Sequence, residues 1–225
     1  MIIISQAWQA AYPGATAGFL VMNRVANPEH HEALDQRKIA LEVELRARFA
    51  DKDRAALAAL PTALAYAAYY GRYRKTYHIL LQLESVALKD RPIPRAAALV
   101  EAMFMAELKN QLLTAGHEMA AIRPPVTVDV ATGDERYTLL NGKQQVLTPG
   151  DMFMRDTQGV ISSVLYGPDD RTRITPSTAR VLFAVYAPPG IAPAAVSEHL
   201  QDIRGHVMLI APEAELELLC LYGEH

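Results

Sequence analysis

The spacing of apolar residues changes halfway along the chain, from the period of a helix to the period of a strand. Short strands are predicted at 2–4 and 18–26. Between 29 and 49 the apolar side chains of Leu34, Leu41, Leu45 and Phe49 fall on one helical stripe, with Ile39 and Val43 opposite, which predicts a helix covered on two sides. Further helices are predicted at 53–60, 61–71, 77–89 and 95–113, the third capped by Thr76 and the last by a left-handed Gly116.

The second half is dominated by short alternating or β-branched runs. Strands are predicted at 126–130, 136–140, 143–147, 151–156, 160–166 and 180–186, and Asn141-Gly142 is a strong signal for a tight hairpin. A helix at 193–204 and a strand at 207–210 follow, and 216–222 fits a strand or a helix. Helices in the first half and strands in the second predict an α+β fold, with the helix-rich half packed on mixed and antiparallel sheets, and we expect a single domain over 1–225.

Charge and cysteine content narrow the function classes. The 225 residues carry 22 basic and 25 acidic side chains, a net charge of −3, so the basic excess typical of a dedicated nucleic-acid binder is missing and any RNA contact would be local. The single cysteine, Cys220, excludes an internal disulfide and a multi-cysteine metal site. The chain begins Met-Ile-Ile-Ile-Ser and contains no apolar run of about 20 residues, from which we expect a soluble cytoplasmic protein without a membrane partner.

A polar loop between two apolar strands is the first candidate site. It opens with Gly167-Pro168 after Tyr166. It combines arginine guanidinium groups, whose paired N–H donors suit carboxylate or phosphate, with the hydroxyl groups of short side chains. Loops held on a rigid scaffold often carry binding residues. The alternative is a solvated loop whose aspartates and arginines pair with one another. The candidate ligand-binding residues are Tyr166, Gly167, Arg171, Arg173, Thr175 and Thr178.

Two other short stretches combine residue types with functional chemistry. Tyr73-Arg74-Lys75 interleaves an aromatic ring with cations and is a candidate RNA contact; a cation cluster favoured by a helix dipole is the alternative. His117-Glu118 is expected at a helix–sheet junction, where imidazole and carboxylate suit acid–base work; a local hydrogen-bonded turn is the alternative.

Familiar catalytic signatures are missing from the sequence. There is no phosphate-binding glycine loop, and Ser162 and Ser163 lie in an apolar run without the turn that exposes a nucleophile. His117-Glu118 begins like a zinc-protease helix, but Ala121 stands where the second histidine would be. We therefore expect no metal and no cofactor.

The order of motifs from about 74 to 191 resembles the editing domain of the phenylalanyl-tRNA synthetase beta subunit, that is, its third and fourth modules, and their free-standing homologues. The resemblance implies that 74–191 is an editing-domain-like core with an extension at 1–73, and a pocket between the sheet and the loop after Tyr166. The motifs that carry it are Ile93-Pro94, Leu99-Val100-Glu101, Gly116-His117-Glu118-Met119, Asn141-Gly142, 151–156, Gly159-Val160-Ile161, Tyr166-Gly167, Thr178 and Tyr186-Ala187-Pro188.

The chain departs from that family at its functional positions. A gapless comparison places Ala115 at the family's editing histidine and His117 at a phenylalanine, although Glu101 and Glu118 match its carboxylates. A shifted comparison makes His117 the histidine but loses both matches. The final strand, which carries a pocket glutamate in the family, has no carboxylate at 181–184, and the family's glycine pair is reduced to Gly167-Pro168.

Two functions follow as hypotheses. The first is a stand-alone module that recognises an aminoacyl-tRNA end or tRNA and hydrolyses mischarged aminoacyl-tRNA if His117 and Glu118 are catalytic. The second is a non-catalytic binding module for an amino-acid-like small metabolite. No part of the chain resembles an ATP-binding aminoacylation core, so an aminoacylating synthetase is not expected.

Overall fold

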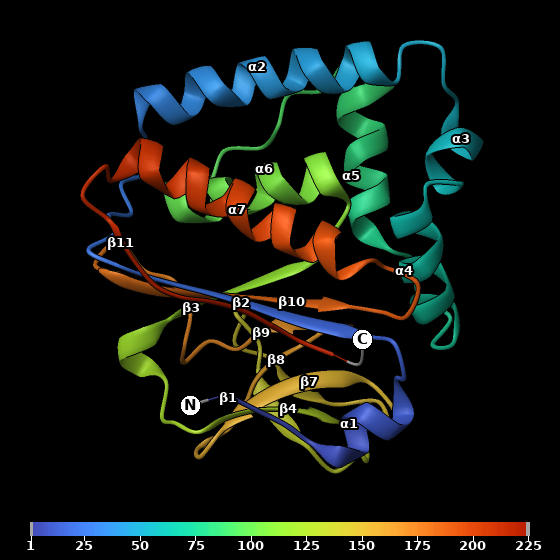
Figure 1. The fold of residues 1–225 in the computed structure, drawn as a ribbon, viewed down its shortest axis with the longest axis vertical. Coiled ribbons are helices and arrows are strands. Elements are labelled where there is room, and N and C mark those ends of the chain that lie inside the picture. The colour runs from blue at the N-terminus through green and yellow to red at the C-terminus, as the bar shows by residue number, and fades with distance from the viewer. Residues whose placement is uncertain (1, 224–225) are drawn as a thin grey trace.

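The structure is a computed structural model that describes residues 2–223, and it has the α+β fold that the sequence predicts. Three layers are stacked on one another: helices, a four-stranded sheet and a five-stranded sheet (Figure 1). The central sheet is therefore covered on both faces, which explains why its two middle strands consist almost entirely of buried residues.

The central sheet is antiparallel throughout, in the order β11-β2-β10-β3. Helices α2, α6 and α7 lie over one face of it, with α5 beside them (Figure 1). The strands are β2 (Thr16–Asn23), β3 (Thr114–Glu118), β10 (Arg180–Ala187) and β11 (Glu215–Tyr222); the helices are α2 (Glu32–Arg48), α3 (Arg54–Ala58), α4 (Pro61–Gly71), α5 (His78–Ala87), α6 (Ala98–Asn110) and α7 (Pro193–Ile210).

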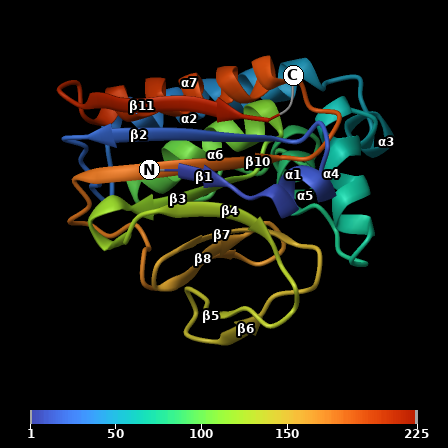
Figure 2. The same ribbon diagram turned by 60° about the horizontal axis from the view of Figure 1, so that its bottom comes forward.

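The second sheet has the order β1-β4-β7-β8-β9, with β1 parallel to β4 and the other pairs antiparallel. The Asn141-Gly142 hairpin is confirmed: Gly142 has φ +79°, and the hairpin lies at the end of the molecule remote from the helices (Figure 2). The elements are β1 (Ile2–Ile4), α1 (Gln6–Ala11), the short helix η1 (Met119–Ala121), β4 (Val126–Val130), β5 (Arg136–Thr138), β6 (Gln144–Val146), β7 (Met152–Asp156), β8 (Gly159–Ser163) and β9 (Gly167–Pro168).

The first two strands of the chain pair with strands from its second half. Strand β1 pairs with β4, and β2 lies between β10 and β11, so this segment supplies a strand to each sheet. One hydrophobic cluster contains Phe19 of β2, Leu41 of α2 and Phe183 of β10. Within the stretch 1–73, expected as an extension of the core 74–191, β1 and β2 thus belong to the same two sheets as the core.

The helix predicted at 95–113 ends earlier, and its cap is wrong. Helix α6 ends at Asn110, and Gln111 takes the left-handed conformation with φ 54°. The side-chain amide of Gln111 donates to the carbonyls of Leu108 and Lys109 at 2.9 and 2.8 Å, which satisfies two acceptors freed at the helix end. Gly116 lies instead in β3, where an added Cβ would come within 2.7 Å of Ile174 Cδ1.

Three other sequence predictions are corrected. The stretch 207–210 is the end of α7, because its buried positions continue the helical stripe of Val196 and Ile203. Thr76 does not cap α5, since Tyr77 occupies that position. Helix α2 is covered on one side only, with Ile39 61% and Val43 60% exposed. The last stretch, open between two alternatives, is strand β11.

None of the helices formed by residues 2–223 combines the length and apolar character needed to cross a membrane.

Candidate functional site

Both arginines of the loop 167–178 are engaged by acidic groups of the protein. The guanidinium of Arg171 donates to Asp156 Oδ1 at 2.9 Å and to the carbonyl of Ala121 at 2.8 Å. Arg173 pairs with Asp170, three residues earlier. Burial raises the pKa of Asp156, but the Arg171 guanidinium and two backbone N–H donors outweigh it and hold that pKa below its usual range. Arg171 therefore ties the loop to β7.

Thr175 and Thr178, the two threonines predicted to bind a ligand, close a turn at the end of the same loop. The hydroxyl of Thr178 accepts from the backbone N–H of Thr175 at 2.9 Å, and Thr178 is buried. The carbonyl of Thr175 accepts from the Asn27 amide at 2.9 Å. Asn27 in turn accepts from the N–H of Leu99 at 2.9 Å, so one buried amide joins this turn to the start of α6.

His117 and Glu118 lie in strand β3 and not at a junction after a capped helix. The His117 ring is fully buried; its Nδ1 is hydrogen-bonded to Thr172 Oγ1 at 2.7 Å, and Thr172 donates to Asp169. Burial lowers the pKa of His117 to about 3, so the ring is neutral. Its Nε2 has no partner among residues 2–223. Glu118 accepts from the N–H of Ala120 at 3.2 Å, at the start of η1.

A cleft opens beside these residues, between α5, α6, the edge strand β3 and the segment 163–168. It has a larger compartment of about 610 Å³ and a smaller one of about 330 Å³. Both compartments are lined by Val100, Met103, Thr114, Leu140 and Pro168, so they adjoin. We call this space the cleft.

The cleft brings together some of the predicted ligand-binding residues and not others. Tyr166 and Gly167 line the larger compartment and Arg173 lines the smaller one. The remaining candidates, Arg171, Thr175, Thr178, His117 and Glu118, line neither compartment.

Glu107 lines the larger compartment and was not among the site residues predicted from the sequence. It follows Met103 by four residues on α6, a spacing that places both side chains on one helix face. Its Oε1 accepts from the backbone N–H of Thr114 at 2.7 Å, and burial raises the pKa of its carboxyl to about 8. The signal available in the sequence was a carboxylate one turn after the apolar stripe position Met103.

Two polar side chains of α5 complete the wall. His78 and Gln82 are four residues apart and both line the larger compartment. Desolvation lowers the pKa of His78. Gln82 Oε1 is buried without a hydrogen-bond partner in the described part of the chain.

Hydrogen bonds fix the opposite wall. The Tyr137 hydroxyl donates to the carbonyl of Gly167 at 2.8 Å, and the N–H of Tyr166 donates to Ser163 Oγ at 3.1 Å. Gly167 has φ +83°, a conformation that glycine adopts without strain. The Tyr166 hydroxyl is bonded to Thr148 at 2.6 Å, so the wall is held at both ends.

Of the predicted RNA-contact residues, Lys75 lies at the edge of the cleft. Lys75 Nζ is 4.5 Å from the centroid of the Tyr166 ring, a cation–π distance. Tyr73 is half-buried, with its hydroxyl 3.3 Å from that of Tyr12, while Arg74 is exposed. We call the stretch 72–75 the basic turn; the Lys75–Tyr166 contact joins it to the cleft.

Comparisons with known proteins find a similar fold but no similar sequence. The architecture defines an α+β protein in which a helix layer, an antiparallel sheet and a mixed sheet are stacked. No family model matches the chain, and no curated protein matches its sequence.

Among solved structures, the chain is similar to an N-terminal fragment of the phenylalanyl-tRNA synthetase beta subunit from Pyrococcus horikoshii. The TM-score is 0.50 at 11% identity, and the match covers 100% of this chain and 54% of that one. The chain therefore spans about half the length of the synthetase fragment, and the likeness is one of fold.

No group of three or more histidine, cysteine, aspartate or glutamate side chains is arranged to hold a metal ion within residues 2–223.

Proposed function

We propose that the protein binds the aminoacyl end of a tRNA, with the amino acid in the cleft and the RNA backbone at the basic turn. The observation that carries this proposal is the distribution of charge: the larger compartment is lined by acceptors and by no lysine or arginine among the described residues, and Lys75 lies at its edge. The fold similarity to a synthetase beta-subunit fragment supports it.

The inside of the cleft suits an aminoacyl ester better than a free amino acid. Within the described residues, no lysine or arginine lines the larger compartment, so a free carboxylate finds no cation there. Gln82 lines the same compartment, and rotation of its side chain brings Oε1, which has no partner among residues 2–223, to an ammonium group. In an aminoacyl ester the carboxyl group is uncharged and only the ammonium needs a partner. Leu113, Val164 and Leu165 offer an apolar wall for the side chain, within a volume typical of small-molecule sites.

The edge of the cleft suits a phosphate backbone. Arg72, Arg74 and Lys75 are all exposed, and Lys75 stands over the ring of Tyr166, which itself lines the cleft. A chain of net charge −3 gains no general attraction for RNA, so this local group must supply the phosphate contacts.

The test compares three ligands by direct binding. The first is a short RNA ending in CCA that carries an apolar amino acid through a non-hydrolysable amide; the second is the same RNA without the amino acid; the third is the free amino acid. We expect the first to bind at least about tenfold more tightly than the others, a difference of about 1.4 kcal/mol. Equal binding of the two RNAs contradicts the proposal.

The alternative, a non-catalytic module for an amino-acid-like metabolite, is favoured by Arg173, the cation that lines the smaller compartment. If the free amino acid binds as tightly as the aminoacylated RNA, and Arg173→Ala abolishes that binding, this second function replaces the first.

A further inference from the structure

Glu107 is a buried carboxyl group with one oxygen fixed and one oxygen free. Oε1 accepts from the N–H of Thr114 at 2.7 Å, and Oε2 has no hydrogen-bond partner among residues 2–223. The residue is 5% exposed and lines the larger compartment of the cleft. A carboxylate in this state is oriented by the backbone and retains an acceptor for a water molecule or a ligand.

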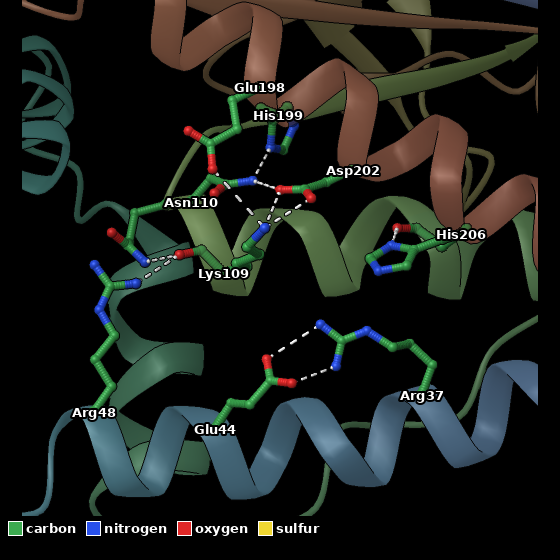
Figure 3. Close-up of polar contacts among 11 residues, drawn as sticks. Arg37, Glu44, Arg48, Lys109, Asn110, Glu198, His199, Asp202 and His206 are labelled. Atoms are coloured by element: carbon green, nitrogen blue, oxygen red, sulfur yellow. Dashed lines mark hydrogen bonds and ion pairs between the residues drawn. The ribbon is translucent and has the colours of Figure 1, made fainter.

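A polar chain between α6 and α7 holds the residue that orients Glu107. Thr114 Oγ1 is hydrogen-bonded to His199 Nε2 at 2.6 Å, and His199 Nδ1 lies 3.3 Å from the Asn110 amide nitrogen. The Asn110 amide donates to Asp202 at 2.8 Å, and Lys109 donates to the same carboxylate (Figure 3). Burial lowers the pKa of His199 to about 3, so the ring that contacts Thr114 is neutral.

Glu107 is the carboxyl group among the residues lining the larger compartment, and it titrates near neutral pH. Burial raises the pKa of Glu107 to about 8, within the range in which a general base is effective. The neighbouring Tyr66, Tyr70 and Tyr77 have pKa values raised by burial and stay neutral, and desolvation lowers the pKa of His78.

One further carboxyl titrates in this range outside the cleft wall. Asp151 accepts from the Tyr69 hydroxyl at 2.5 Å, and burial raises its pKa to about 7. It is not a lining residue, so its titration must be separated from that of Glu107 by a variant.

We propose that Glu107 is the general base for hydrolysis of the aminoacyl ester bound in the cleft. Its carboxylate removes a proton from a water molecule, and the water oxygen attacks the ester carbonyl carbon. The bond between that carbon and the ribose oxygen then breaks, and the ribose oxygen takes the proton from the Glu107 carboxyl. Water is the only co-reactant, and the products are the amino acid and the free tRNA end. This inference rests on the proposed function, because it requires the ester to occupy the cleft.

The experiment uses the full chain with total tRNA aminoacylated with the complete set of amino acids, and quantifies the amino acids released. Wild type is compared with Glu107→Gln, Glu107→Asp, Asp151→Asn and the control Glu44→Gln, whose side chain pairs with Arg37 on the outer helix α2. We expect the Gln variant to lose about 10²–10⁴-fold in kcat, the Asp variant to keep part of the activity, and the control to be unchanged. The amide-linked aminoacyl RNA should still bind to the Gln variant.

The pH profile separates a general base from a structural role. The wild-type rate should rise with pH as Glu107 ionises and then level off, in the Asp151→Asn variant as well, while the residual rate of Glu107→Gln should lack that rise. If wild type binds the amide-linked RNA but releases no amino acid, or if Glu107→Gln releases it at the wild-type rate, the inference falls and the proposed binding stands. If the amide-linked RNA does not bind to wild type, both fall.

Discussion

The ammonium group of Lys75 lies over the ring of Tyr166, 4.5 Å from its centroid, and so joins the basic turn to the wall of the cleft. The residues come from different parts of the fold: Lys75 precedes α5, and Tyr166 follows β8. A ligand with both a phosphate backbone and an amino acid would meet these two groups in succession. Their contact makes the edge of the cleft the first place to test.

Replacing Lys75 by alanine should weaken tRNA binding and reduce its dependence on salt. Each lost phosphate contact lowers the slope of log K against log salt by about 1. Titrations of wild type and Lys75→Ala at several salt concentrations measure the slope. Lys52, exposed in the turn after α2, is the matched control. Identical slopes for Lys75→Ala and wild type would remove the basic turn from the interface.

Replacing Arg171 by alanine should destabilise the protein without abolishing binding in the cleft. The Asp156 carboxylate loses its guanidinium partner and keeps only the backbone N–H groups of Arg123 and Gln158, and the loss of a hydrogen bond to a charged group costs about 1.5–3 kcal/mol. Urea denaturation measures the loss, and binding of the amide-linked RNA is measured well below the transition. Arg173→Ala should be milder, because Arg173 and Asp170 are both exposed to solvent. A loss of binding with unchanged stability would mean that Arg171 contacts the ligand.

Replacing Asn27 by alanine should loosen the loop 167–178 from α6. The buried Asn27 amide donates to Thr175 and accepts from Leu99, both at 2.9 Å, so alanine leaves two backbone groups without partners. We expect a loss of about 1–3 kcal/mol in the free energy of unfolding. Asn27→Asp keeps the acceptor and loses the donor, and should fall between wild type and Asn27→Ala. Faster amide hydrogen exchange confined to the loop would locate the effect.

The sequence predicts those elements whose signals are local. Asn141-Gly142 specifies its hairpin because glycine tolerates the positive φ that the turn needs, and Asp53 caps its helix through the N–H of Ala56 at 2.9 Å. The end of α6 was not predictable in this way. Gln111, a residue rarely left-handed, is held there by its own side chain, while the glycine that looked like a cap is needed in β3 for close packing.

The candidate site was predictable only in part. Tyr166 and Gly167 are found by their place after an apolar strand, and both line the cleft. Glu107 and Gln82 lie within helices, and each resembles an ordinary polar residue in sequence. They become part of a site because α5, α6 and the segment 163–168 meet, and that meeting depends on packing between distant segments. The loop arginines attract attention in sequence, but their charges are matched by nearby aspartates.

Replacing Gly18 by alanine should destabilise the contact between β2 and α7. A Cβ at this position would lie 2.6 Å from Val196 Cγ1 and 3.1 Å from both Leu200 and Leu221, so three core side chains would have to move. Overpacking of this kind costs about 1–3 kcal/mol. Gly205→Ala on α7, where an added Cβ meets nothing within 4 Å, is the matched control. Thermal denaturation of the two variants should differ; equal stability would show that α7 shifts without cost.

Replacing Glu107 by glutamine should change how stability depends on pH. Burial raises the folded-state pKa of Glu107 from 4.5 to about 8, so between these values the folded protein binds more protons than the unfolded chain. Stability from this group is therefore complete below about pH 4.5 and is lost as pH rises towards 8, at about 1.4 kcal/mol for each unit of pKa difference. The glutamine variant lacks this loss, so its free energy of unfolding relative to wild type should increase from pH 5 to pH 9. Urea denaturation at both pH values tests this, with Glu44→Gln as the control. A constant difference in the free energy of unfolding between Glu107→Gln and wild type would show that the carboxyl of Glu107 is ionised throughout. Such a carboxyl would be unsuited to the role of a base poised near neutral pH.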